Sequence, residues 1–232
     1  MIRSHRVWLS RICHSPVSRK SEEAARSMEE WGIPWPDGSE DLFRKTPDER
    51  GHVMVRHMDT AYDRAEGFKR AGDALADHCI SLRVGGSIEK TMVLPVLHAY
   101  HHAIEIQLKR LLTALYTFHK IDQGTPHHHE IVELWKVARA LLRKTSGDLT
   151  DAVDEAITRC ISQLAESTAK GEAARYSHDE RGNRLPVTQE FLDLANVKTV
   201  VNRVYSYLSW TRDTYVEREG QRRDWEREQE SW

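Results

Sequence analysis

The chain has 232 residues, a formal net charge of −2 and 30% charged residues. This length suits one large domain or one domain with appendages. Because the net charge is close to zero, the overall charge does not favour binding to nucleic acid or to a membrane surface. No run of about 18 apolar residues occurs, so we expect no membrane-spanning helix. Three scattered cysteines without a CxxC pair suit a reducing compartment, and we expect a cytoplasmic protein.

The first part of the chain is expected to be a partly irregular leader, residues 1–48. A short helix is predicted at 21–31. Residues 32–38 then break any regular element, because two prolines and two glycines fall within seven positions. From about residue 47 to 82 a long helical pattern follows. Its expected inward positions are Met54, Met58, Tyr62, Phe68, Ala71, Leu75 and Cys79.

The central predicted helix runs from about residue 88 to 119. On a helical wheel, at about 100° per residue, it carries one apolar stripe that should face the core. The stripe consists of Leu97, Tyr100, Ile104, Leu108, Leu111 and Leu115. Pro95 falls inside this helix, where it either introduces a kink or marks the true start.

Three more helices are predicted after the central one. Thr125 and Pro126 have the residue types of an N-cap and a first helical position, so the next helix is expected to begin there. Its expected core face is Ile131, Leu134, Trp135, Ala138, Leu141 and Leu142. Another helix is predicted at about 149–170. After an ordered loop at 172–186, a last long helix is expected from Thr188.

The end of the chain is rich in alternating charges, which fits either a solvated helical extension or a frayed tail. We find no convincing alternating strand pattern and no internal repeat. The predicted fold class is therefore all-α: a helical bundle of four to five main helices with an N-terminal appendage. The expected division is a leader at 1–48, a helical domain at 49–212 and a charged tail at 213–232.

A polar strip follows the edge of the apolar stripe on the central helix. It consists of His98, His101, His102, Glu105 and Lys109. Burying imidazoles, a carboxylate and an ammonium is costly unless these groups pair with one another. We therefore expect the strip to be half buried, as either a satisfied network or a site. For Lys109 the plainer interpretation is an ion pair with Glu105, four residues earlier.

A metal site is one interpretation of this strip. His98, His102 and Glu105 have helical spacing, and the run at 127–129 could add further imidazole ligands. However, the chain lacks the Glu-x-x-His and HExxH signatures of di-metal bundles and metalloproteases. Ordinary polar contacts between helices are the simpler explanation, and we expect neither a metal nor a cofactor.

Acid–base chemistry on RNA is a second interpretation. Cleavage by the 2′-hydroxyl needs a base, an acid and a cation near the phosphate, which His with Arg or Lys can supply without a metal. Catalytic candidates are His101, His102, Glu105, Arg175 and His178, and candidates for substrate binding are Lys109, His128 and His129. A helix start near Pro126 would also favour a phosphate.

The segment HAYHHAIEIQLKRLL, followed by HHHEIVELW, resembles the HEPN superfamily of small helical bundles. The matching positions of the first piece are His102, Glu105, Leu108 and Lys109. Those of the second are His128 or His129, with Leu134 and Trp135. The resemblance covers roughly residues 60–212.

This resemblance implies a homodimer. It also implies that the chain is either a metal-independent RNase of toxin–antitoxin, CRISPR or antiphage systems, or a non-catalytic partner of another protein. Nuclease members carry an Arg followed, after four to six residues, by a His. Here that spacing is found in Arg50 and His57, which lie before the matching region, whereas Arg175 and His178 are too close together.

The first hypothesis is therefore a HEPN-like endoribonuclease of toxin–antitoxin or antiphage defence that acts on RNA. His101 or His102 would be the base or acid, Glu105 would orient it, and Arg175 or Lys109 would hold the phosphate. The alternative is a non-catalytic HEPN module that binds a cognate partner protein or a nucleotide. A metal-dependent helical-bundle enzyme is a third interpretation.

Overall fold

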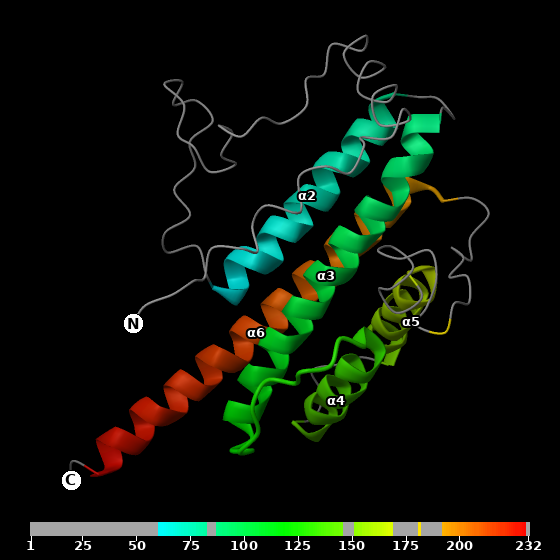
Figure 1. Ribbon diagram of the computed structural model, residues 1–232. Helices are drawn as coiled ribbons and strands as arrows, with labels where there is room; N and C mark the ends of the chain where they lie inside the picture. The colour runs from blue at the N-terminus through cyan, green and yellow to red at the C-terminus, as the bar shows by residue number, and fades with distance from the viewer. Residues whose placement is uncertain (1–59, 83–86, 146–150, 169–180, 182–191, 231–232) are drawn as a thin grey trace, which may run out of the picture. The chain divides into compact units, whose positions relative to one another are not determined.

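The computed structural model describes residues 60–82, 87–145, 151–168, 181 and 192–230. Within these residues the fold is all-α, with five helices and no strand, as predicted (Figure 1). The helices are α2 (Ala61–Ser81), α3 (Ser87–Phe118), α4 (Ile131–Lys144), α5 (Asp151–Ser167) and α6 (Leu194–Glu230). No helix in the described part of the chain is both long enough and apolar enough to cross a membrane. The predicted leader lies outside the described residues.

α2 packs against α3 in the antiparallel sense. Near one end of the pair, the Arg110 guanidinium lies 5.1 Å from the centre of the Tyr62 ring. Farther along, the Tyr100 hydroxyl donates to the Asp73 carboxylate at 2.9 Å. α2 begins with a capping box between Thr60 and Asp63, in which the Thr60 hydroxyl accepts the Asp63 backbone N–H at 3.1 Å.

α6 lies along both α2 and α3 (Figure 1). It runs antiparallel to α2, because Lys198 reaches Asp77 at 2.5 Å while Tyr205, seven residues later, reaches Glu66 at 3.3 Å. It therefore runs parallel to α3. α4 and α5 pack against each other on the other side of α3 (Figure 1), so α3 is the helix that all the others contact.

The core is built around the apolar stripe predicted on α3. All six positions of that stripe, from Leu97 to Leu115, are buried. The expected core face of α4 is buried as well. Between α4 and α5, the Trp135 indole N–H donates to the Thr158 hydroxyl at 2.8 Å. This bond satisfies the only polar atom of a fully buried ring.

The predicted inward face of α2 is partly wrong. Tyr62 is 52% exposed and Ala71 is exposed, whereas the buried residues are small. These are Ala65, Gly72, Ala76 and Cys79. A Cβ added to Gly72 would lie 2.7 Å from two ring carbons of Tyr100. Small side chains on α2 thus leave room for the aromatic ring of α3.

Two predicted helix starts are also wrong. The helix expected from Thr125 begins at Ile131, with Glu130 at the N-cap position. The last helix, expected from Thr188, begins at Leu194, because Asp193 caps it through a 3.0 Å bond to the Asn196 backbone N–H. At its other end α6 continues without a break to Glu230, so the solvated helical extension is the correct alternative for the charged end.

Candidate functional site

The polar strip of α3 centres on Glu105, which is only 4% exposed. Three cationic or titratable side chains meet its carboxylate. Lys109 Nζ lies 2.8 Å and His129 Nδ1 2.7 Å from Oε1, and His102 Nδ1 lies 3.3 Å from Oε2. The expected ion pair between Lys109 and Glu105 is thus present. The cluster also includes His129, which is 24 residues away in the chain.

The ionised form of Glu105 is strongly favoured. Burial alone raises the pKa of this carboxyl, but the hydrogen bonds from His102, Lys109 and His129 outweigh burial and bring the pKa down to about 2. Glu105 is therefore a buried, fixed negative charge at every physiological pH, and it holds its partners in defined orientations.

His101 lies one position away from this cluster and is 3% exposed. Its Nδ1 is 2.8 Å from the Thr168 hydroxyl, just past the end of α5, and its ring also hydrogen-bonds the backbone of His129. Burial is the main cause that lowers the pKa of His101 to about 4. The ring is thus a neutral, fully engaged imidazole that joins α3, α5 and the segment before α4.

His102 faces α2 instead. The Phe68 ring meets it edge-on, with ring centroids 4.3 Å apart, and His98 stacks on it at 6.1 Å. Its side chain remains 33% exposed. Among the α3 histidines of the cluster, His102 therefore has both an oriented ring and access to solvent.

His129 reaches Glu105 because the segment from residue 121 to 130 runs back along α3. The hydroxyls of Thr113 and Thr125 lie 3.1 Å apart, and His129 then meets Glu105. The four extended steps between Thr125 and His129 span about 13 Å, and the eight helical steps between Thr113 and Glu105 span about 12 Å. The two paths match in length, which keeps this segment extended and delays the start of α4.

The predicted site residues thus fall into three groups. The structure brings five of them together: His101, His102, Glu105, Lys109 and His129. His128 instead lines a separate cavity of about 350 Å³ with His127 and Tyr116. Arg50, His57, Arg175 and His178 lie outside the described residues.

Two members of the site were not predicted. Thr168 is fully buried and holds His101, and Phe68 packs against His102. No local pattern marks Thr168, since it is 67 residues from its partner. Phe68 was predicted only as a core residue. The helix start near Pro126, on which the expected phosphate site depended, is wrong, because α4 begins five residues later.

Within the described ranges, no group of three or more His, Cys, Asp or Glu side chains is arranged to hold a metal ion. Glu105 instead has an ammonium and two imidazoles as neighbours, a donor set that neutralises a carboxylate by hydrogen bonds.

In comparisons with known proteins, no family model, no curated protein and no solved structure matches this chain.

Proposed function

We propose that the chain is a HEPN-like ribonuclease that cleaves RNA without a metal ion, with His129 as the general base. The observation that carries this proposal is the 2.7 Å contact from His129 Nδ1 to the buried Glu105 carboxylate. A carboxylate on one ring nitrogen orients an imidazole and fixes its tautomer. The His129 side chain is 71% exposed, so its other nitrogen is available to a substrate.

In the proposed reaction, His129 Nε2 takes the proton from an RNA 2′-hydroxyl, and the oxygen attacks the adjacent phosphorus. His102, on the other oxygen of the same carboxylate, donates a proton to the 5′-oxygen that leaves. The products are a 2′,3′-cyclic phosphate and a 5′-hydroxyl. Lys109, beside Glu105, contributes positive charge near the phosphate.

This proposal shifts roles among the residues that the sequence suggested. Glu105 keeps its orienting role, but His129 replaces His101 as the principal base. His101 is buried, and its ring is engaged by Thr168 and by the backbone of His129. In the proposal it is a positioning residue that holds His129 in place.

The test is cleavage of a fluorescently labelled RNA by the purified chain in EDTA. We expect cleavage by the wild type, and a loss of at least about 100-fold in His129→Gln and in His102→Gln. His127→Gln is the matched control, because His127 is exposed on the same segment but does not contact Glu105. Full activity of His129→Gln would overturn the assignment, and activity that requires a metal would overturn the mechanism.

A non-catalytic HEPN-like module is the second candidate, and one observation favours it. The ion pairs of Glu105 are complete without a substrate, as expected of a structural contact that fixes the 121–130 segment to α3. On this alternative, no RNA is cleaved under any condition, yet Glu105→Gln still lowers the melting temperature. Cleavage and thermal unfolding measured on the same variants distinguish the two functions.

A further inference from the structure

Arg110 is a half-buried cation without a carboxylate partner. Its guanidinium donates to the neutral amide oxygen of Gln107 at 2.6 Å and lies over the Tyr62 ring. Within the described residues, no carboxylate lies in ion-pair distance of it. By contrast, Arg139 and Arg222, which are also partly buried, each contact a carboxylate at 2.6 Å.

A second guanidinium adds to this charge. Arg212 of α6 is level with this part of α3, because α3 and α6 run parallel and Arg222 meets the end of α3 at Phe118. After burial, the charge of Arg212 is the next cause that lowers the pKa of Arg110. Two like charges near each other are unfavourable unless an anion is shared between them.

The carboxylates in the neighbourhood are already engaged. Asp213 binds Arg212 at 2.7 Å, and Glu66 binds Arg70 at 2.8 Å and the Tyr205 hydroxyl at 3.3 Å. Both guanidiniums still have N–H groups to spare, since each can donate five hydrogen bonds. The cluster formed by Tyr62, Arg110 and Arg212 therefore has donors and positive charge in excess.

Gln107 is the residue that leaves the positive charge of Arg110 without a neutralising partner. Its side chain is fully buried, its oxygen holds Arg110, and its amide nitrogen has no hydrogen-bond partner in the described structure. A buried donor without a partner costs about 1–3 kcal/mol. A glutamate of the same shape would neutralise Arg110, with a buried acceptor in place of the buried donor. A glutamine at this position leaves the guanidinium charge available to a ligand.

We propose that Arg110 and Arg212 bind a phosphate monoester, with Tyr62 as a platform for an aromatic ring of the same ligand. Guanidinium groups match phosphate oxygens in geometry and charge, and two of them can hold one phosphate. Tyr62 is 52% exposed, so a base can stack on its ring as in other nucleotide sites. A nucleoside monophosphate has both parts.

This site is separate from the Glu105 cluster. Arg110 is five residues after Glu105, which places it about 140° around α3. Besides Gln107 of α3 itself, its neighbours come from α2 and α6, whereas those of Glu105 come from α3 and from the segment before α4. Phosphate binding at this site therefore does not depend on the ribonuclease activity.

The test is calorimetric titration of the full chain with inorganic phosphate, AMP and adenosine. We expect phosphate and AMP to bind, AMP more tightly, and adenosine not to bind. In Arg212→Gln, both affinities should fall at least about tenfold. In Tyr62→Leu, AMP should bind no more tightly than phosphate, whose own affinity stays unchanged. Arg203→Gln, a change of an exposed arginine elsewhere on α6, should leave all three titrations unchanged.

Gln107→Glu is the sharpest variant, because it changes one nitrogen to oxygen at a buried position. We expect it to abolish phosphate binding, because its carboxylate neutralises Arg110. If it does not fold, Arg212→Gln decides the question, since that side chain lies partly in solvent. The proposal is overturned if neither anion binds the wild type, or if Arg203→Gln weakens binding as much as Arg212→Gln.

Discussion

Gly72 is the residue at which the packing of α2 on α3 can be tested most directly. Its added Cβ would lie 2.7 Å from Tyr100, whose ring is fully buried and tethered to Asp73 through its hydroxyl. The ring has little room to move. We expect Gly72→Ala to reduce the free energy of unfolding by about 1–3 kcal/mol, measured by urea denaturation.

Gly67 is the matched control on the same helix, because nothing lies within 4 Å of an added Cβ there. Removal of a glycine from an open helical position favours the helix, so Gly67→Ala should stabilise the protein by up to about 1 kcal/mol. Equal effects of the two substitutions would show that Tyr100 does not limit the space at Gly72.

Glu105 should make stability depend on pH in the acid range. Its pKa is about 2 in the folded chain, against about 4.3 when unfolded, so the carboxylate stabilises the fold above pH 4.3. This contribution, on the order of 3 kcal/mol, is lost as pH falls from about 4.3 to 2. In Glu105→Gln, urea denaturation should show lower stability at pH 7 and a smaller slope in that window. An unchanged slope would contradict the assigned pKa.

His101 should make the stability of the fold depend on pH in a higher range. Its pKa is about 4 when folded and about 6.5 when unfolded, so the unfolded chain binds the extra proton between these values. Stability should therefore fall as pH drops from about 6.5 to 4. His101→Gln should remove this part of the pH dependence while leaving the part below pH 4 intact, which the same denaturation series measures.

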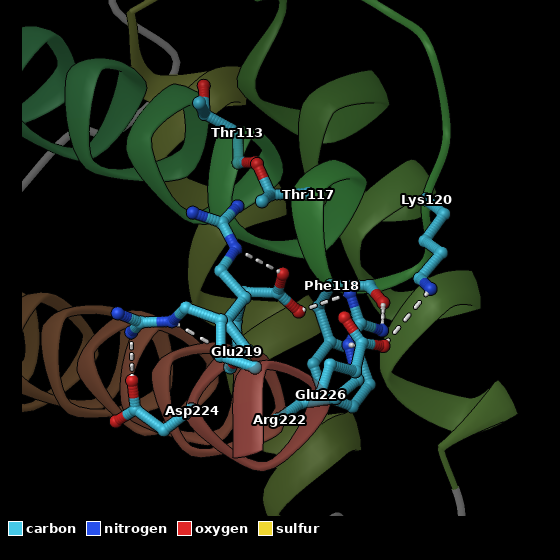
Figure 2. Close-up of polar contacts among 10 residues, drawn as sticks. Thr113, Thr117, Phe118, Lys120, Glu219, Arg222, Asp224 and Glu226 are labelled. Atoms are coloured by element: carbon cyan, nitrogen blue, oxygen red, sulfur yellow. Dashed lines mark hydrogen bonds and ion pairs between the residues drawn. The ribbon is translucent and has the colours of Figure 1, made fainter. Parts of the chain in front are cut away.

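At the scale of an element, the extension of α6 has its own anchor. Glu219 is buried at 6% exposure, and it receives Arg222 at 2.6 Å and Arg223 at 2.8 Å. Figure 2 shows Arg222 between this carboxylate and the end of α3, where it donates to the Phe118 carbonyl at 3.1 Å. Lys120 also reaches Glu226 at 3.4 Å. One arginine thus satisfies a buried charge and a C-terminal carbonyl of α3 together.

We expect Arg222→Ala to loosen the end of α6 without unfolding the bundle. Hydrogen exchange should show protection lost over 220–230 and retained over 200–215, because the earlier part is held by buried Val204, Leu208 and Tyr215. Arg227→Ala is the control, since its partner Asp224 lies on the exposed side of the same helix. A global loss of protection in Arg222→Ala would contradict a local anchor.

The elements that could be predicted from the sequence are those in which the size and polarity of the side chains indicate which face is buried. Bulky apolar residues at helical spacing identified the buried stripe of α3 and the core face of α4. On α2 the same rule failed, because Ala65, Gly72 and Ala76 are buried for their small size. Hydrophobic spacing does not detect a close approach between helices.

The site was predictable only where it is local. His102, Glu105 and Lys109 are three and four residues apart, so their contact follows from the helix. The role of His129 could not be derived in the same way. Thr125 and Pro126 carry a strong local signal for a helix start, but the contacts with Thr113 and Glu105 keep that segment extended. Tertiary contacts here outweigh local preference.

At the scale of the whole molecule, α5 is the helix that should open first. It packs chiefly on α4 and more sparsely on α3 and α6. Asp154, which is fully buried, binds both Arg139 and Arg143 of α4, and the Arg139 bond is the main cause of its lowered pKa. We expect Asp154→Ala to lower the free energy of opening of α5 by about 2 kcal/mol, because charged hydrogen bonds are lost.

Native-state hydrogen exchange measures this opening helix by helix. Amides of α5 should exchange faster in Asp154→Ala, while those of α2 and α3 keep their protection, since their mutual packing does not involve Asp154. Lys136→Ala is the control, because its pair with Glu133 is exposed and should contribute under about 1 kcal/mol. Opening of α5 also separates Thr168 from His101. His101 should therefore react with diethyl pyrocarbonate at the rate at which the α5 amides exchange. If all helices lose protection together, the bundle unfolds as one unit and α5 has no separate opening.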